Sequence, residues 1–312
     1  MLSRTADNLY WTGRYMERAE NLARVLDVSY RNSLLGLAAA APESEWRDAL
    51  AILGNPAQFY QRGHDFTEAA VVRFFALDTE SPCSIKFCVQ AARENARALR
   101  AVISTEMWES INSTWLAVSD LDHAGLLARG LREFCDWVKE RSHLFRGVSH
   151  GTTLHDDAFH FLRLGTFLER ADSTARLLDT KYRSLESMNA EATGATYYAW
   201  GSVLRQASAF RAYHQTYHDV ITPRRVAELL ILRLEMPRSL RFCARELAQH
   251  LDALAGTRDL EAQRLVGELH ARLRFATIDR LLGQGLHEFL AEVVGRITEL
   301  SSQLAQDFLM TI

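Results

Sequence analysis

The sequence predicts an all-α protein, a multi-helix bundle built from two tandem, similar halves that pack as one unit. Three observations lead to this prediction. Apolar residues recur at helical spacing over long stretches, and no stretch alternates in the manner of a β-strand. Proline is scarce, at five residues in 312, so few positions would interrupt a helix. A helix-length segment also occurs twice, about 152 positions apart, which is typical of an internal duplication.

The repeated segment reads NLYWTGRYMERAENLARVLDVSYR at residues 8–31 and HFLRLGTFLERADSTARLLDTKYR at residues 160–183. The two copies agree at charged and small positions as well as apolar ones. The shared positions include Gly13 and Gly165, Glu17 and Glu169, and Arg18 and Arg170. Agreement of this kind over a helix length is not expected from composition alone, so we interpret the segment as the central helix of each half.

A second match supports the division into halves. Residues 71–88 align with residues 226–243, and both contain Pro-x-Ser-[Ile/Leu]-[Lys/Arg]-Phe-Cys. We therefore expect a first half over residues 1–150 and a second half over residues 151–312, joined in one compact domain.

In the first half, Asp7 is the expected N-cap of a helix that runs to about Ser33. A segment of small residues, 36–42, should then break the chain. Further helices are expected over residues 43–53, over residues 67–76 and from Ser81-Pro82 onward, where proline suits a first helical turn.

The second half should follow a long helix over residues 121–148 and a break at residues 147–153. After the repeated segment, the last third contains two amphipathic stretches, residues 260–275 and 285–309. We expect these two helices to close the bundle.

A helical projection of the first copy separates a charged line from a wide apolar arc. The charged line comprises Glu17, Glu20, Arg24, Asp27 and Arg31, which are spaced three or four residues apart. For its outer members the favoured interpretation is a solvated face, on which each pair contributes only a few tenths of a kcal/mol.

Glu17 and Arg18 need a different explanation. They are adjacent, so they point about 100° apart, and Arg18 projects toward the apolar arc. A charge aimed into a packed surface must be paired, because a bare buried charge costs several kcal/mol. Our structural hypothesis is that the two repeated helices lie side by side near a pseudo-twofold axis. Glu17 would then pair with Arg170, and Glu169 with Arg18.

The two halves diverge after the Phe-Cys element, and the first half is the better candidate for a ligand site. Its candidate binding residues are Arg14, Arg18, Arg93, Glu94, Asn95, Arg97 and Trp108, with Arg170 from the second half. Arginines in such a set can clamp a carboxylate or a phosphate. The dense Arg/Glu/Asn stretch fits a solvated helix face equally well.

We expect no metal and no cofactor. The chain contains no Walker loop, GxSxG elbow, HExxH or Rossmann fingerprint, and its four cysteines form no zinc spacing. Two histidine groups are weak candidates for a metal site, and the second is a pair without a third ligand at a defined spacing. They are His150, His155, Asp156, Asp157 and His160, and the i,i+4 pair His214 and His218.

Composition excludes other classes of protein. The net charge of −3 and the lack of a basic stripe argue against nucleic-acid binding. No apolar run is long enough to span a bilayer, and the first residues lack a signal-peptide pattern, so we expect a cytoplasmic protein without membrane association.

Several blocks resemble the alpha-E domain family, an all-helical bacterial family called after its Glu–Arg motif. The blocks are residues 8–20, Leu164-Gly165 with Glu169 to Asp172, Gln90 to Arg97, Glu106 to Glu109, and Pro237 to Leu240. The resemblance covers essentially the whole chain. One departure is Arg163, which stands where the first copy has Trp11, so the halves need not share one pocket.

The resemblance implies a role in peptide synthesis, modification or tagging. Members of the family are usually encoded beside an ATP-grasp-like amide ligase and a transglutaminase-like cysteine peptidase, which are therefore the expected partners. The favoured hypothesis is a non-catalytic partner, or substrate-presenting subunit, of the ligase. The alternative is an enzyme acting on an acyl or peptidyl intermediate, with Glu17 or Glu169 as acid/base and arginines as anion clamp. A third interpretation makes the Glu–Arg pairs purely structural. The sequence is also compatible with a homo-oligomer.

Overall fold

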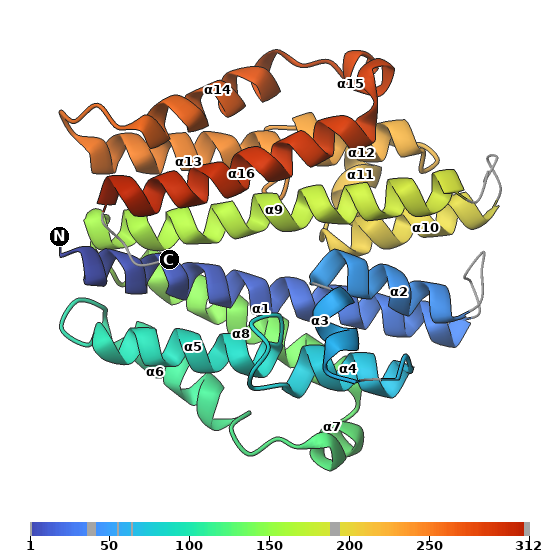
Figure 1. The fold of residues 1–312 in the computed structure, drawn as a ribbon, viewed down its shortest axis with the longest axis horizontal. Helices are drawn as coiled ribbons and strands as arrows, with labels where there is room; N and C mark the ends of the chain where they lie inside the picture. Colours follow the sequence, from blue (N-terminus) through green and yellow to red (C-terminus); the bar gives the residue numbers. More distant parts are fainter. Residues whose placement is uncertain (1, 36–41, 55, 64, 188–193, 309–312) are drawn as a thin grey trace.

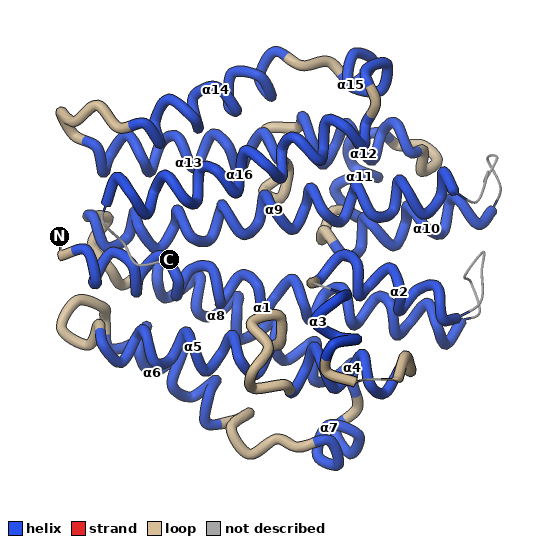
Figure 2. The backbone as a smooth tube through the Cα atoms, in the orientation of Figure 1, coloured by secondary structure: helices blue, strands red, loops and turns tan. Residues whose placement is uncertain are grey.

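A computed structural model describes residues 2–35, 42–54, 56–63, 65–187 and 194–308. Across these residues the regular secondary structure is entirely helical, with sixteen helices, which confirms the predicted all-α class (Figure 2). The helices are α1 (Ser3–Leu35), α2 (Pro42–Leu53), α3 (Pro56–Gln61), α4 (Glu68–Leu77), α5 (Ile85–Ala98), α6 (Thr105–Leu116), α7 (His123–Arg129), α8 (Leu131–Gly151), α9 (Asp157–Ser187), α10 (Gly194–Gln206), α11 (Phe210–Tyr217), α12 (Pro223–Leu232), α13 (Leu240–Ala255), α14 (Glu261–Phe275), α15 (Ile278–Gln284) and α16 (Leu286–Phe308).

The two repeated helices, α1 and α9, lie side by side through the middle of the molecule (Figure 1). Helices α5 and α8 flank α1 on one side, and α13 and α16 flank α9 on the other. Buried apolar side chains from both halves, such as Leu26, Phe74, Leu178 and Leu230, belong to one connected core. Each central helix is therefore covered on most of its circumference.

Two glycines set the closeness of this central contact. A Cβ atom on Gly13 would overlap the carbonyl oxygen of Leu162, and a Cβ atom on Gly165 would overlap the carbonyl oxygen of Tyr10. The missing side chain lets the two backbones touch at the crossing. This contact explains why the repeated segment carries glycine at the same place in both copies.

The second series of helices follows the order of the first, at an offset of about 155 residues. The helix caps agree as well. Ser84 accepts from the backbone N–H of Phe87, and Ser239 accepts from that of Phe242, so both cap the helix after the Pro-x-Ser element. This order is what the predicted duplication would produce; the duplication itself stays a prediction, as does the division into halves at residue 150.

Several sequence-based boundaries were wrong. Asp7 lies inside α1, which begins at Ser3, so it is not an N-cap. Helix α5 begins at Ile85, because Ser84 caps it and Pro82 lies in the preceding turn. The single helix expected over residues 121–148 is two helices, α7 and α8, because Gly130 adopts a positive φ of 86° between them. The expected break at residues 36–42 falls largely outside the described residues.

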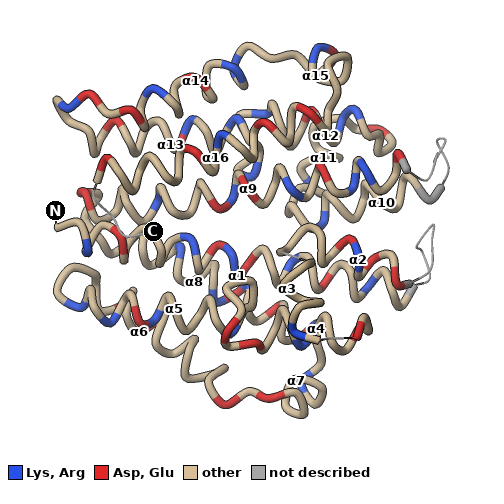
Figure 3. Tube along the Cα trace, in the orientation of Figure 1, with Lys and Arg blue, Asp and Glu red and all other residues tan. Residues whose placement is uncertain are grey.

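The solvated face expected for the outer part of the charged line on α1 is found only at its end, where the side chain of Arg31 is 39% exposed. Glu20 and Asp27 are buried, at 0% and 4% exposed. Figure 3 shows that charges of both signs lie along the central helices as well as on the outer ones. The reason is geometric: helices of both halves surround α1, so its polar face is covered too. No helix of the described residues is long and apolar enough to cross a bilayer.

Candidate functional site

The two Glu–Arg motifs pair with each other across the contact between α1 and α9. Arg170 donates from Nε and Nη2 to the two carboxylate oxygens of Glu17, at 2.9 and 2.8 Å. Arg18 donates in the same way to Glu169, at 2.5 and 2.9 Å. These bidentate contacts confirm the hypothesis drawn from the sequence, and they join the first half to the second at its centre.

Each glutamate also has a second arginine. Arg14 donates from Nε to Glu169 at 2.8 Å. Arg238, in the Pro-x-Ser element of the second half, lies 3.0 Å from Glu17 and donates to Glu20 at 2.7 Å. The second arginine comes from a different element in the two cases, so the two sides of the crossing are not equivalent.

The pairing decides the protonation of both carboxyls. Burial alone would raise the pKa of Glu17, but Arg170 and Arg238 outweigh it and lower that pKa to about 2. Burial would also raise the pKa of Glu169, but Arg18 and Arg14 outweigh it and lower that pKa to about 2. Both groups are ionised at any ordinary pH, and guanidinium N–H groups occupy their oxygens.

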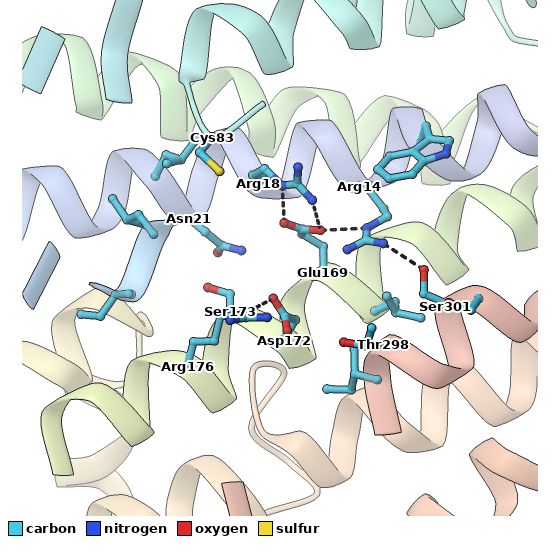
Figure 4. Close-up of a pocket in the computed structure, with 18 residues that line it drawn as sticks. Arg14, Arg18, Asn21, Cys83, Glu169, Asp172, Ser173, Arg176, Thr298 and Ser301 are labelled. Atoms are coloured by element: carbon cyan, nitrogen blue, oxygen red, sulfur yellow. Dashed lines mark hydrogen bonds and ion pairs between the residues drawn. The ribbon is translucent and has the colours of Figure 1, made fainter. Parts of the chain in front are cut away.

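A cavity of about 430 Å³ lies on one side of the crossing, between α1, α9 and α16 (Figure 4). Its polar and charged lining residues are Arg14, Arg18, Asn21, Cys83, Glu169, Asp172, Ser173, Arg176, Thr298, Ser301 and Ser302. Its apolar wall consists of Trp11, Leu22, Ile52, Leu53, Leu168 and Ile297. The Glu169 ion pair thus forms part of the wall of an open pocket.

The corresponding place on the other side of the crossing is nearly full. There the space lined by Glu17, Arg146 and Arg163 measures only about 10 Å³. Arg238 and Arg146 both reach Glu20 on that side. When the two halves are aligned by the order of their helices, Cys83 occupies the position equivalent to Arg238, and Ser301 the position equivalent to Arg146. The cavity exists because two short side chains stand where the other half has two arginines.

Arg163, the departure noted in the sequence, belongs to the filled side. Its guanidinium lies over the ring of Phe167 at 4.5 Å. Burial and the neighbouring Arg170 lower the pKa of Arg163 to about 10. Trp11, its counterpart, stacks on Tyr15 at 5.3 Å and lines the open side. The halves therefore differ at the pocket, as the substitution suggested.

The other binding candidates form a separate cluster on α5 and α6, and none of them lines the cavity. Arg93 pairs with Glu94 at 2.5 Å and donates to Asn112 at 3.1 Å, while Arg97 pairs with Glu94 at 2.8 Å. Both Arg93 and Arg100 lie over the ring of Trp108, at 5.9 and 4.6 Å. Asn95 is partly buried on the same helix. Of the candidates, only Arg14, Arg18 and Glu169 line the cavity.

The histidine groups do not form a recognisable metal centre in the described part of the chain, where no three potential ligands converge. His160 contacts His250 through their Nδ1 atoms at 2.9 Å, and His155 stacks on Phe159 at 3.9 Å. His218 ends α11 in the left-handed conformation, so it does not share a helical face with His214 as an i,i+4 pair would.

Comparison with known families matches residues 1–309 to the model of Alpha-E, described as a predicted alpha-helical domain with a conserved ER motif. The chain belongs to the Alpha-E family. It contains the dipeptide Glu-Arg three times, at residues 17–18, 140–141 and 169–170. In this Alpha-E chain the first and third occurrences are the ones that pair with each other at the centre of the molecule.

Relatives of this Alpha-E chain include an uncharacterized protein of Mycobacterium bovis and two of Mycobacterium tuberculosis. Each is 26% identical to it over an alignment 328 positions long, which covers 94% of this chain. The chain spans only about a third of their length, at 35%. No solved structure matches the chain.

Sequence reasoning found the Glu–Arg pairs but missed most of the cavity. Cys83, Arg238 and Ser301 carried no signal as single residues. The alignment of the two Pro-x-Ser elements does place Cys83 against Arg238, and this difference in size and charge was the available sign that one side is open.

Proposed function

We propose that this Alpha-E chain is a non-catalytic, cytoplasmic helical subunit of a peptide amide ligase system. In this role it holds the peptide on which an ATP-grasp-type ligase acts, and a transglutaminase-like cysteine peptidase is a second candidate partner. The partners follow from the family resemblance. The binding role is argued from the geometry below.

The observation on which the proposal rests is the open cavity beside the buried ion pair of Glu169 with Arg18 and Arg14. Its volume, about 430 Å³, lies within the range of small-ligand pockets, and its wall combines apolar side chains with a few convergent polar groups. Glu169, on that wall, already accepts hydrogen bonds from two arginines. A site built in this way favours binding over proton transfer.

The length of the mycobacterial relatives supports a role in which the chain associates with another protein. In the mycobacterial proteins the region similar to this chain is 35% of the whole, so other segments are joined to it covalently. A helical unit that is fused to further segments in some proteins fits a subunit that associates with a partner in others.

The alternative is an enzyme in which Glu17 or Glu169 acts as acid/base. One observation favours it: Glu169 lines the cavity and is within reach of a bound ligand. Its chemistry is disfavoured, because a carboxyl with a pKa of about 2 carries no proton to give near pH 7 and is a weak base.

The test is an affinity purification of the tagged chain from its own host at native expression, read by mass spectrometry. We expect an ATP-grasp-type ligase in near-equal amount, and light scattering of the purified complex then gives the stoichiometry, including any homo-oligomer. Recovery of the chain alone, with the same tag and wash, would contradict the partnership and favour the stand-alone enzyme.

A further inference from the structure

The charged groups around the cavity do not balance. Three arginines, Arg14, Arg18 and Arg176, face two carboxylates, Glu169 and Asp172, which leaves one positive charge over. Arg18 gives Nε and Nη2 to Glu169. The two others have N–H groups to spare among the described contacts. Arg14 uses only Nε and Nη1, and Arg176 uses only Nε, toward Asp172 at 2.8 Å. The cavity therefore presents an excess of donors.

A buried amide points to the same kind of ligand. Asn21 is 6% exposed and lies on the cavity wall (Figure 4). Its Oδ1 accepts from Nη1 of Arg238 at 2.7 Å, which fixes the orientation of the amide. Its Nδ2 has no hydrogen-bond partner among the described residues. A buried donor left without an acceptor is unfavourable, so a ligand oxygen at this place would satisfy it.

The rest of the wall limits what that ligand can be. Ser301, whose hydroxyl accepts from Arg14, lines the cavity together with Ser302 and Thr298, whereas Trp11 and Leu53 belong to the apolar part. A single unbalanced positive charge matches a ligand with one negative charge. A phosphate, which carries about 1.5 or more negative charges at pH 7, would leave negative charge uncompensated beside Glu169 and Asp172.

We propose that the cavity binds the free C-terminal carboxylate of a short peptide, with the terminal side chain against the apolar wall. The carboxylate would receive N–H groups from Arg14, Arg176 and Asn21. This inference deepens the proposed function and rests on it, because it names the class of substrate that the subunit holds.

The probe is N-acetyl-alanyl-alanine, compared with its C-terminal amide by isothermal titration calorimetry at pH 7. The free acid should bind saturably, and the amide at least about tenfold more weakly, because it loses the charge-assisted hydrogen bonds. Inorganic phosphate, the comparison anion, should bind more weakly than the free acid.

The second half of the chain supplies the design of a blocking variant. Cys83→Arg places in the cavity the side chain that Arg238 places on the filled side. It should abolish binding of the free acid while the melting temperature stays at or above that of the native chain. Arg176→Ala should weaken binding about tenfold, since one charged donor is lost. Its matched control is Arg31→Ala, which breaks a similar i,i+4 pair, Arg31 with Asp27, away from the cavity and should leave binding unchanged.

Three results would overturn the inference: equal binding of acid and amide, tighter binding of phosphate, or no binding of the free acid to the native chain at about 20 mM. Native affinity in Cys83→Arg would overturn it as well. The ligase purification answers separately. If the ligase is recovered but the free acid does not bind, the partnership is supported and the carboxylate site is contradicted. If the free acid binds but no ligase is recovered, the carboxylate site is supported and the partnership is contradicted.

Discussion

At the scale of single residues, the Glu–Arg motif holds the molecule together. Glu17 is almost fully buried, and Arg170 and Arg238 both depend on it for charge compensation. An ion pair in such a place contributes little compared with an apolar pair of the same shape, but the loss of one partner leaves the other charge bare. We therefore expect the motif to be sensitive to substitution because it is buried.

Glu17→Gln should destabilise the protein by about 3–5 kcal/mol, because the buried guanidinium of Arg170 loses its countercharge and Arg238 keeps only Glu20. Urea denaturation of the native chain and the variant measures the difference. The control is Glu268→Gln, an exposed glutamate paired with Arg264 and Arg296, for which a change within about 0.5 kcal/mol is expected. Similar losses for both variants would show that Glu17 has no special structural role.

The depressed pKa values of Glu17 and Glu169 predict a dependence of stability on pH. A carboxyl whose pKa falls from 4.5 to about 2 on folding stabilises the protein above its unfolded value. That contribution is lost as the pH falls from about 4.5 toward about 2. Urea midpoints at pH 6, 4 and 3 should fall more steeply for the native chain than for Glu17→Gln. Parallel curves would contradict the assignment.

Contacts that depend on one helix could be predicted from the sequence, whereas contacts that depend on several packed elements could not. The pairing of Glu17 with Arg170 followed from the angle between adjacent residues and the cost of a bare buried charge. The cavity did not, since its wall combines side chains from α1, α9, α16 and the turn before α5. Only the packed structure shows that Cys83 leaves space where Arg238 fills it.

At the scale of elements, the contact between α1 and α9 depends on two glycines. Gly13→Ala should cost about 1–3 kcal/mol or more, because its Cβ would meet the backbone of α9 rather than a side chain that can move. Gly295, in α16, is the matched control: a Cβ there would meet nothing within 4 Å. Gly295→Ala should stabilise the helix by roughly 0.5–1 kcal/mol. Thermal or urea denaturation of both variants measures the two changes in stability. Equal effects would contradict the close approach of α1 and α9 at Gly13.

The helices themselves were largely predictable, and the errors have specific causes. The two central helices, and those that begin after Thr67 and Leu260, follow from apolar spacing. The interruption at Gly130 was missed because glycine is tolerated within a helix and its positive φ is visible only in the structure. The burial of Glu20 was missed because a projection shows one helix and not the neighbours that cover it.

At the scale of the whole molecule, the halves depend on each other. Each half contributes one partner to both central ion pairs, and each central helix packs against the other. We expect one cooperative unfolding transition in calorimetry. The two halves made separately, divided after residue 155 so that the cut falls between α8 and α9 and not inside α8, should remain largely unfolded, because each exposes a helix face and unpaired charges. Circular dichroism of the separate halves checks this, and two independently stable halves would contradict it.

Pairing with arginine across the two halves, and not proton transfer, is the role that we assign to Glu17 and Glu169, and the adjacent cavity is the proposed binding site. The most direct test is NMR of the side-chain carboxyl carbons of ¹³C-labelled glutamate, with Glu17→Gln and Glu169→Gln used for assignment. Both carboxyls should remain ionised at every pH at which the protein is folded, in keeping with pKa values of about 2. A midpoint above 4.5 for either carboxyl in the folded protein would contradict it, and would return that glutamate to the role of a proton donor.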